Sequence, residues 1–191
     1  MNSIIRFSIT CLLIATGTFE SSAQNLFSTQ LLTLDEKFFS SSEWEKNKLT
    51  VVVILLADCP ACQSYSLTLN KLSSEFADRR VKFYGVFPGN YGSVAEDIEF
   101  SDIYKIRFPL LRDPNKNLVA ILHAKVAPEV FVFTSTGKSI YRGRIDDWMY
   151  AVGKKRIRIE SQDLKNALTQ WTSGKAISRP STTPILSLIH I

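Results

Sequence analysis

Residues 49–76 read LTVVVILLADCPACQSYSLTLNKLSSEF: an apolar run, two cysteines and then an amphipathic segment. The run LTVVVILLA, residues 49–57, is rich in β-branched residues and leucine and shows no polar alternation, which is typical of a strand buried on both faces of a parallel sheet. Apolar residues then recur at helical spacing from Tyr65 to Phe76. The stretch therefore predicts a buried strand, a CxxC motif at its carboxyl end and a helix of about four turns.

The CxxC motif, formed by Cys59 and Cys62, opens the predicted helix. Pro60 suits the first helical turn, where a backbone N–H would have no partner. A helix N-terminus favours a negatively charged sulfur, so position marks Cys59 as the candidate nucleophile and Cys62 as the candidate resolving thiol. A purely structural disulfide is disfavoured, because a bridge that closes so short a loop adds little stability. A redox pair, two metal ligands and two inert thiols remain open at this point.

The first 23 residues have the composition of a secretory signal peptide. Arg6 supplies the positive start, residues 9–16 an apolar stretch and residues 21–23 a small-residue cleavage site. Cys11 lies inside this segment without the small-residue box that precedes a lipidated cysteine, so lipid anchoring is not expected. Further along, no run reaches about 18 consecutive apolar residues. We expect an exported protein, periplasmic or secreted, without stable membrane insertion.

The length and charge of the chain indicate how many domains it forms and which partners it can bind. With 191 residues, 45% of them hydrophobic, the chain is long enough for one sizeable core and short for two domains. The net charge is +5, and the most concentrated basic stretch is GKKRIRIE, residues 153–160. Neither interleaved aromatic residues nor a nucleic-acid-binding motif accompanies it, so we expect a solvated loop and no nucleic-acid partner.

The rest of the chain continues to alternate between strands and helices. The predicted elements are a strand over 81–88, a helix over 93–106, a short strand over 107–114, a short helix over 115–124, two strands over 129–134 and 139–145 joined as a hairpin, a closing helix over 163–171 and an irregular tail over 175–191. The helix over 93–106 is expected to turn four apolar residues inward, namely Val94, Ile98, Ile103 and Ile106. The tail ends in ILSLIHI, which is apolar enough to dock on the body or on a partner.

Three stretches resemble a known family. They are DCPACQSY at 58–65, FPLLRDPNKNLVAIL at 108–122 and VAPEVFVFTSTGKSIYRGRIDD at 126–147. In this order they resemble the thioredoxin superfamily, and within it the exported redoxin branch (AhpC/TSA-like). The resemblance implies an α/β, thioredoxin-like fold: a central mixed sheet flanked by helices, with a redoxin-type helix-strand insertion. It divides the chain into a signal peptide (1–23), a redoxin domain (24–174) and an irregular C-terminal tail (175–191).

The resemblance also implies how the site is built. Pro128 would be a cis-proline that faces the cysteines, with the backbone of Ala127 near Cys59. The strand that begins at Glu129 would lie beside the strand that ends at Ala57. A substrate peptide could then pair with Ala127 as an added strand. Cys59 and Cys62 would be the catalytic residues, and Ala127 and Pro128 would shape the substrate groove.

The implied activity is thiol–disulfide exchange with exported proteins. It needs protein thiols or disulfides as substrates and a reducing partner protein, but no metal or organic cofactor. Asp58 departs from the family pattern, because it occupies the place where thioredoxins carry tryptophan. A carboxylate beside Cys59 would oppose thiolate formation if it pointed at the sulfur. The direction of electron flow, reducing or oxidising, and the oligomeric state stay open.

A thiol peroxidase is one alternative, since many relatives destroy peroxides. Peroxiredoxins resemble one another in a Pro-x-x-x-Thr/Ser-x-x-Cys motif, whose hydroxyl and arginine partners polarise the peroxide bond. The corresponding positions here are Val52 and Leu56, so the proline and the hydroxyl are both missing. Arg142 and Arg144 remain as possible sources of positive charge.

Two further alternatives use the same residues differently. A copper-binding metallochaperone would hold the metal through both cysteines and His123, although relatives that do so have a CxxxC spacing. A binding module with inert cysteines would leave the motif unused. Similar exported redoxins often carry a further cysteine near the C-terminus, where this chain has Ser187, so Cys62 would be the only resolving partner for Cys59.

Overall fold

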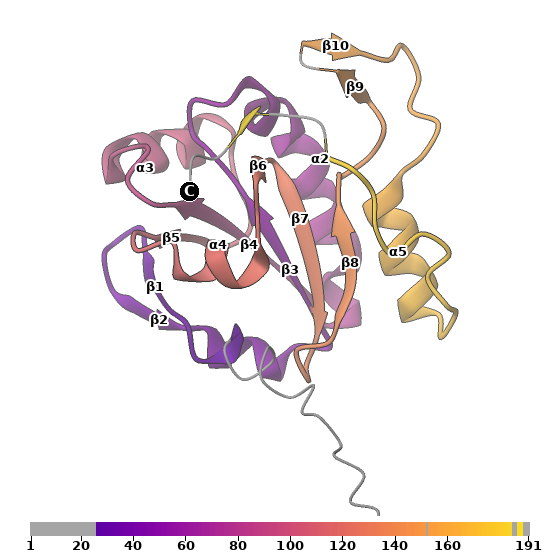
Figure 1. Ribbon diagram of the computed structural model, residues 1–191, viewed down its shortest axis with the longest axis horizontal. Coiled ribbons are helices and arrows are strands. Elements are labelled where there is room, and N and C mark those ends of the chain that lie inside the picture. Colours follow the sequence, from indigo (N-terminus) through magenta and orange to yellow (C-terminus); the bar gives the residue numbers. More distant parts are fainter. Residues whose placement is uncertain (1–25, 152, 185–186, 189–191) are drawn as a thin grey trace, which may run out of the picture.

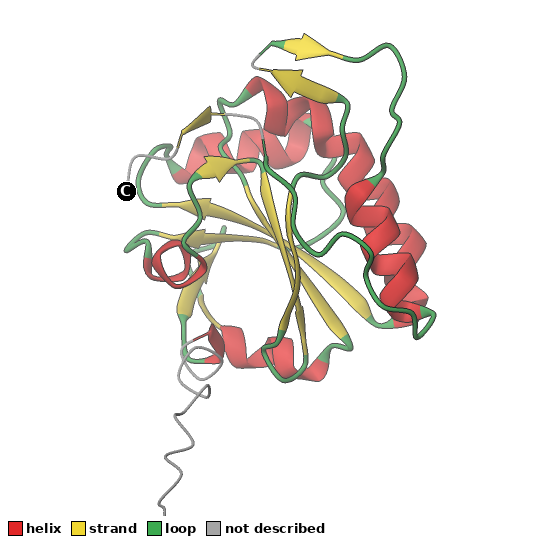
Figure 2. Cartoon of the chain, turned by 45° about the vertical axis from the view of Figure 1, so that its right-hand side comes forward, coloured by secondary structure: helices red, strands yellow, loops and turns green. Residues whose placement is uncertain are grey.

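The computed structural model describes residues 26–151, 153–184 and 187–188, so the predicted signal peptide (1–23) lies outside the described residues. Within them, seven strands form one mixed sheet in the order β2-β1-β5-β4-β3-β7-β8 (Figures 1 and 2). These strands are β1 (Gln30–Thr33), β2 (Phe38–Ser40), β3 (Leu49–Ile54), β4 (Val81–Pro88), β5 (Leu110–Asp113), β7 (Glu129–Thr134) and β8 (Ser139–Gly143). Two short pairs lie outside the sheet, β6 (Val126–Ala127) with β11 (Ser187–Leu188) and β9 (Met149–Ala151) with β10 (Lys154–Lys155).

Helices cover both faces of the sheet. They are α2 (Pro60–Phe76), α3 (Val94–Ile103), α4 (Asn117–Leu122) and α5 (Asp163–Thr172), with short 3-10 helices η1 (Ser41–Lys46) and η2 (Ala77–Arg79). Figures 1 and 2 show α2 and α5 on one face and α4 on the other. This is the flanked mixed sheet that the sequence predicts. Within the described residues, no helix has the length and apolarity needed to cross a bilayer.

Strand β3 lies inside the sheet, between β4 and β7, and is buried as the run over 49–57 predicts. All six of its residues are buried. It runs parallel to β4 and antiparallel to β7, so apolar side chains on both of its faces meet other apolar side chains. Its register with β7 places Ile54 opposite Glu129. The carboxyl end of β3 therefore lies beside the start of β7, where the resemblance placed the substrate groove.

The prediction for the buried face of α3 is wrong for Ile98 and Ile103, whereas Ile106, just beyond the helix, packs against the core as expected. Ile98 and Ile103 are 42% and 59% exposed, whereas Asp97 and Phe100 are buried. Asp97 is buried because Arg112 of β5 lies against it, with Nε 2.9 Å from Asp97 Oδ2. The buried face of α3 therefore carries the charged Asp97, while Ile98 and Ile103 lie on the exposed face.

The N-terminal strands and the basic segment also show what the sequence pattern missed. Strands β1 and β2 extend the sheet beyond β5, and Phe38 on β2 is 82% exposed. The basic stretch over 153–160 is exposed, as expected, but part of it pairs with β9 as a small hairpin that projects from the body (Figure 2).

The C-terminal segment, predicted to be irregular, contains ordered contacts. Ser181 forms a parallel bridge with Arg142 of β8. Further along, β11 pairs with β6. Of the apolar ending ILSLIHI, only residues 187–188 are described, and they pair with β6. The other residues of this ending lie outside the described residues. Because the pairing joins segments distant in sequence, a local pattern could not reveal the strand.

Candidate active site

The CxxC motif lies where β3 ends and α2 begins. Cys59 is the N-cap of α2, with extended backbone dihedrals, and Pro60 is the first helical residue. The backbone N–H of Gln63 donates to Cys59 O (3.1 Å). The cysteines therefore open the helix, as predicted, and the unpaired N–H groups and the dipole of the first turn favour a negative charge at this place.

Cys62 is completely buried. The backbone N–H of Leu56 donates to its sulfur at 3.4 Å. Burial raises the pKa of the Cys62 thiol well above its ordinary value, and the adjacent Cys59 side chain and the charge of Asp58 raise it further. No disulfide is formed by Cys59 or Cys62 in the described part of the chain. Cys62 is therefore a neutral thiol near neutral pH.

Cys59 faces the segment that precedes β7. Its Sγ lies 3.7 Å from the carbonyl oxygen of Ala127 and donates to it. The Ala127–Pro128 peptide bond is cis, as the resemblance implies. The structure thus brings together all four residues assigned to the site, Cys59, Cys62, Ala127 and Pro128. Cys59 is nevertheless only 3% exposed, so a partner sulfur cannot reach it without a local movement.

Asp58 is exposed, and the side-chain amide of the neighbouring Gln63 donates to Ala57 O (2.9 Å). These residues line one side of a cavity of about 320 Å³ beside the CxxC loop. The other side is formed by the loop after β4 and by α3, with Tyr91, Phe100 and Arg112 among its residues. The cavity can accommodate side chains that flank a substrate cysteine.

A buried pair of polar groups supports α2 one turn beyond Cys62. The Tyr65 hydroxyl donates to Asp146 Oδ1 (2.6 Å), and the backbone N–H of Trp148 donates to the same oxygen (2.9 Å). Burial raises the pKa of Asp146, and it raises the pKa of Tyr65 far above its ordinary value. The sequence analysis did not identify this contact. Residue spacing carries no signal for a bond across 81 positions.

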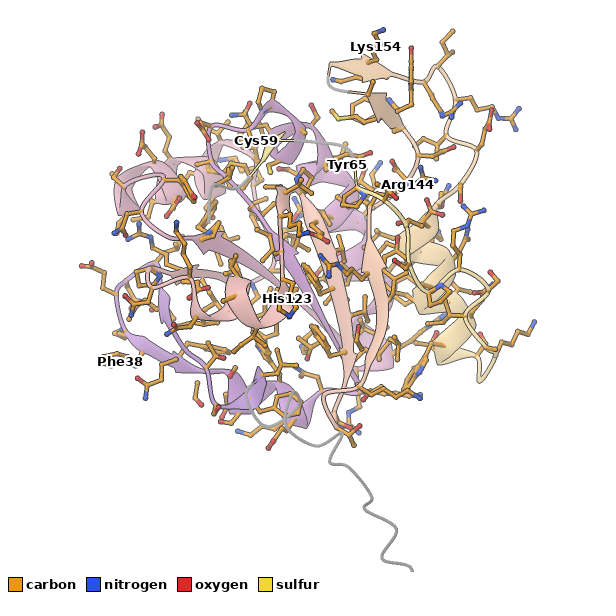
Figure 3. The ribbon with its side chains drawn as sticks, in the orientation of Figure 1. Phe38, Cys59, Tyr65, His123, Arg144 and Lys154 are labelled. Atoms are coloured by element: carbon orange, nitrogen blue, oxygen red, sulfur yellow. The ribbon has the colours of Figure 1, made fainter. Side chains whose placement is uncertain are left out.

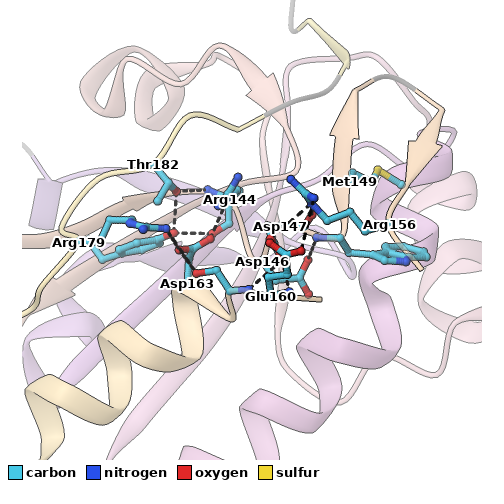
Figure 4. Close-up of polar contacts among 12 residues, drawn as sticks. Arg144, Asp146, Asp147, Met149, Arg156, Glu160, Asp163, Arg179 and Thr182 are labelled. Atoms are coloured by element: carbon cyan, nitrogen blue, oxygen red, sulfur yellow. Dashed lines mark hydrogen bonds and ion pairs between the residues drawn. The ribbon is translucent and has the colours of Figure 1, made fainter. Parts of the chain in front are cut away.

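The run RGRIDD, residues 142–147, forms ion pairs with other segments of the chain. Arg144 pairs with Asp163 at the start of α5 (2.6 Å), whereas Asp147 pairs with Arg156 (3.5 Å). Figure 4 shows both pairs reaching out of the run to other segments. The run therefore ties the end of β8 to α5 and to the segment after β10.

The residues invoked for a peroxidase are engaged elsewhere. Val52, at the position of the proline, is buried in β3, and Leu56, at the position of the hydroxyl, is apolar. Arg142 Nε lies 2.7 Å from Glu129 Oε1, and Arg144 pairs with Asp163. Each arginine thus has a carboxylate partner away from the cysteines.

The copper alternative lacks a ligand cluster. His123 ends α4 in an exposed position, and Figure 3 shows it well apart from Cys59. Among the described residues, no three His, Cys, Asp or Glu side chains gather in a way that could hold a metal ion. The three proposed copper ligands are therefore not brought together.

Solved structures of other proteins resemble this chain in fold. An uncharacterised conserved protein from Geobacillus kaustophilus has a TM-score of 0.76 at 18% identity, covering 86% of this chain and 89% of that chain. A secreted Mycobacterium tuberculosis disulfide oxidoreductase homologous to E. coli DsbE has a TM-score of 0.54 at 20% identity, covering 61% and 82%. A thiol:disulfide interchange protein of the thioredoxin family from Chlorobium tepidum has a TM-score of 0.57 at 16% identity, covering 76% and 93%. At these identities the likeness shows a thioredoxin-like fold.

A comparison of the sequence with protein-family models identifies the family. No curated protein matches the sequence significantly. The AhpC/TSA family model matches residues 23–142, which include both cysteines and the cis-proline. This match spans more than half of the chain, and the chain therefore belongs to the AhpC/TSA family, with a thioredoxin-like redoxin domain.

Proposed function

We propose that this protein is a thiol–disulfide oxidoreductase that acts on cysteines of exported proteins. Cys59 is the nucleophile and Cys62 the resolving thiol. One observation carries the proposal: Cys59 caps α2 with its sulfur 3.7 Å from Ala127 O, directly before the cis bond to Pro128, and Cys62 lies one turn behind it. A sulfur at a helix N-terminus, beside the backbone of Ala127, has the position that disulfide exchange requires once a partner can reach it.

The reaction balances with these two thiols alone. The Cys59 thiolate attacks one sulfur of a substrate disulfide, forming a mixed disulfide and releasing the other substrate sulfur as a thiolate, which takes up a proton. Cys62, after losing its proton, attacks Cys59 and releases the second substrate thiolate. The substrate gains two electrons and the CxxC pair becomes a disulfide. A reducing partner protein returns the pair to two thiols, and the reverse sequence oxidises a substrate.

The burial of Cys62 supports this division of roles. Its raised pKa keeps it protonated in the resting protein, so it does not compete as the attacking thiolate. Its place on the same helical turn puts it within reach of Cys59 once a mixed disulfide has formed. A completely buried sulfur cannot meet an external disulfide first.

Trapping experiments test these roles. Cys62→Ser, incubated with insulin disulfides, should accumulate a mixed disulfide through Cys59, seen as a mass increase that a reducing agent removes. Cys59→Ser, which retains Cys62, is the matched control and should trap nothing. Equal trapping by both variants would show that the roles are wrongly assigned.

A peroxide assay separates this function from the peroxidase alternative. The wild-type protein is treated with hydrogen peroxide, and loss of the Cys59 thiol is followed by mass spectrometry. We expect a rate close to that of free cysteine, because Arg142 and Arg144 are each paired with a carboxylate, Glu129 and Asp163 respectively. A rate greater by orders of magnitude would favour a peroxidase.

A further inference from the structure

The C-terminal segment occupies the place where an added substrate strand would lie. Strand β11 pairs antiparallel with β6, Ser187 opposite Ala127 and Leu188 opposite Val126. Ala127 is the residue whose carbonyl oxygen meets Cys59 Sγ. In Figure 1 the short yellow arrow of β11 lies next to β6 above the sheet. The chain therefore presents its own backbone to the edge beside the nucleophile.

The segment before β11 is anchored firmly on β8. The N–H of Arg142 donates to Pro180 O and the N–H of Thr182 donates to Arg142 O, each at 3.0 Å. Thr182 Oγ1 accepts from the N–H of Arg144 (3.0 Å) and lies 2.8 Å from the Tyr141 hydroxyl. This set of bonds holds residues 180–182 as an added strand along β8.

Gly143 permits this close approach. Its φ is +140°, and a Cβ at this position would lie 2.2 Å from Thr182 Oγ1 and 2.3 Å from Thr182 O. Any other residue would therefore collide with the segment and adopt a strained backbone conformation. The chain has a glycine where the tail crosses β8.

A buried carboxylate completes the anchor. Arg179 Nη1 lies 3.0 Å from Asp163 Oδ1, and Arg144 Nε lies 2.6 Å from Asp163 Oδ2. Figure 4 shows Thr182 and the two arginines gathered around Asp163 at the start of α5. The anchor thus joins the tail, β8 and α5, while β11 lies five residues beyond Thr182.

We propose that the C-terminal strand is a tethered mimic of the substrate, which lies on β6 and restricts access to Cys59 until an extended segment of a partner protein replaces it. The inference deepens the proposed function, since it rests on Cys59 as the exchanging thiol. It names the substrate class: cysteines within extended chain segments that add antiparallel to Val126 and Ala127. It also accounts for a nucleophile that is only 3% exposed in this arrangement.

Tethering makes the competition effective despite the small size of β11. A segment joined by a short linker is present at an effective concentration of about millimolar. A free partner segment must therefore bind more tightly than two paired residues, or be present at a higher concentration. The pairing of β11 with β6 joins backbone groups, so a substitution that keeps the backbone N–H should leave the docking intact.

Alkylation of Cys59 measures access directly. A variant that ends at Pro184 keeps the anchor on β8 and loses β11. The rate of its reaction with iodoacetamide is followed by mass spectrometry of the Cys59 peptide, with Cys62→Ser in every variant so that one site thiol reports. We expect about a tenfold faster reaction than in the full chain, the factor that corresponds to about 1.4 kcal/mol of docking free energy. Equal rates in the two folded proteins would overturn the inference.

Two further measurements remove folding as an explanation. Leu188→Pro in the full chain should accelerate alkylation similarly, because proline is incompatible with a paired strand, whereas Ser187→Ala should leave the rate unchanged. A synthetic peptide TPILSLIHI (residues 183–191) should slow alkylation of the shortened protein, and the same peptide with proline at position 188 should not. An effect of Ser187→Ala equal to that of Leu188→Pro would contradict backbone pairing.

The result is separable from the proposed function. Faster alkylation without mixed disulfides in Cys62→Ser would support the tail inference and refute the oxidoreductase. Mixed disulfides formed equally fast with and without residues 185–191 would refute the tail inference and leave the oxidoreductase supported.

Discussion

Replacing Tyr65 by phenylalanine removes one hydroxyl from the support of α2 and keeps its ring. That hydroxyl donates to the carboxylate of Asp146 at 2.6 Å, and both side chains are 3% exposed. The ring meets Trp148 edge-on at 5.5 Å, a contact that phenylalanine retains. After the change, the described partner of Asp146 Oδ1 is the N–H of Trp148. The perturbation therefore removes one charge-assisted hydrogen bond, together with the longer bond that the Met149 N–H donates to the Tyr65 hydroxyl (3.5 Å).

A hydrogen bond to a charged group contributes about 1.5–3 kcal/mol, so Tyr65→Phe should lower the free energy of unfolding by about 2 kcal/mol near pH 7. For a chain of this length that corresponds to a fall in Tm of about 4–8 °C. Burial raises the pKa of Asp146 above its ordinary value of 3.8. As pH falls through that raised pKa, the carboxylate becomes neutral and the bond weakens. The difference between wild type and variant should therefore be largest above the pKa and shrink below it.

Urea unfolding of four proteins measures the effect: wild type, Tyr65→Phe, Asp146→Asn and the double variant. The Tyr65→Phe change should cost at least about 1 kcal/mol less in the Asp146→Asn background, which is the coupling expected of two residues in direct contact. Tyr150→Phe is the control, because Tyr150 is 49% exposed. A loss below about 0.5 kcal/mol, or a coupling of zero, would refute the assignment of this bond.

Three smaller changes test other parts of the structure. Burial raises the pKa of Asp97 to about 6 despite the Arg112 ion pair, so the folded state holds a proton that the unfolded state releases, and stability should fall by about 3 kcal/mol as pH rises from about 4 to 6. Asp97→Asn should remove that slope in urea unfolding at several pH values, and an unchanged slope would assign it to another group. Gly85→Ala would place a Cβ 2.5 Å from Leu110 Cδ2, so thermal unfolding should show a loss of about 1–3 kcal/mol, and a neutral result would mean that the leucine moves freely. Ser93→Ala removes the N-cap of α3 and should cost about 1 kcal/mol by the same measurement, with no loss expected if the capping box is not formed in solution.

The parts of the fold that the sequence predicts correctly are those built from local patterns. The apolar run of β3, the proline after Cys59 and the hairpin between β7 and β8 each carry their signal within a few residues. Strands β1 and β2 were missed because they are only four and three residues long, too short for alternation to be recognised.

The parts that the sequence could not provide depend on contacts between distant residues. The buried face of α3 follows from an ion pair between Asp97 and Arg112, which no periodicity reveals. For the candidate site, the two cysteines and Pro128 were recognisable from motifs, whereas the support by Asp146 was not. The position of β11 was hidden for the same reason, since its partner β6 lies about sixty positions earlier.

The two borders of the main sheet are closed to further chains by different means. Beside β8, residues 180–182 run along the outer strand and take up backbone groups that a second molecule would otherwise pair with. At the other border, β2 is the outermost strand among the described residues, and it is only three residues long, so it offers few groups for intermolecular pairing. Because a chain that ends at Pro184 keeps residues 180–182, it exposes the edge at β6 without uncovering β8. Self-association of the shortened protein is therefore not expected to accompany the change in thiol access.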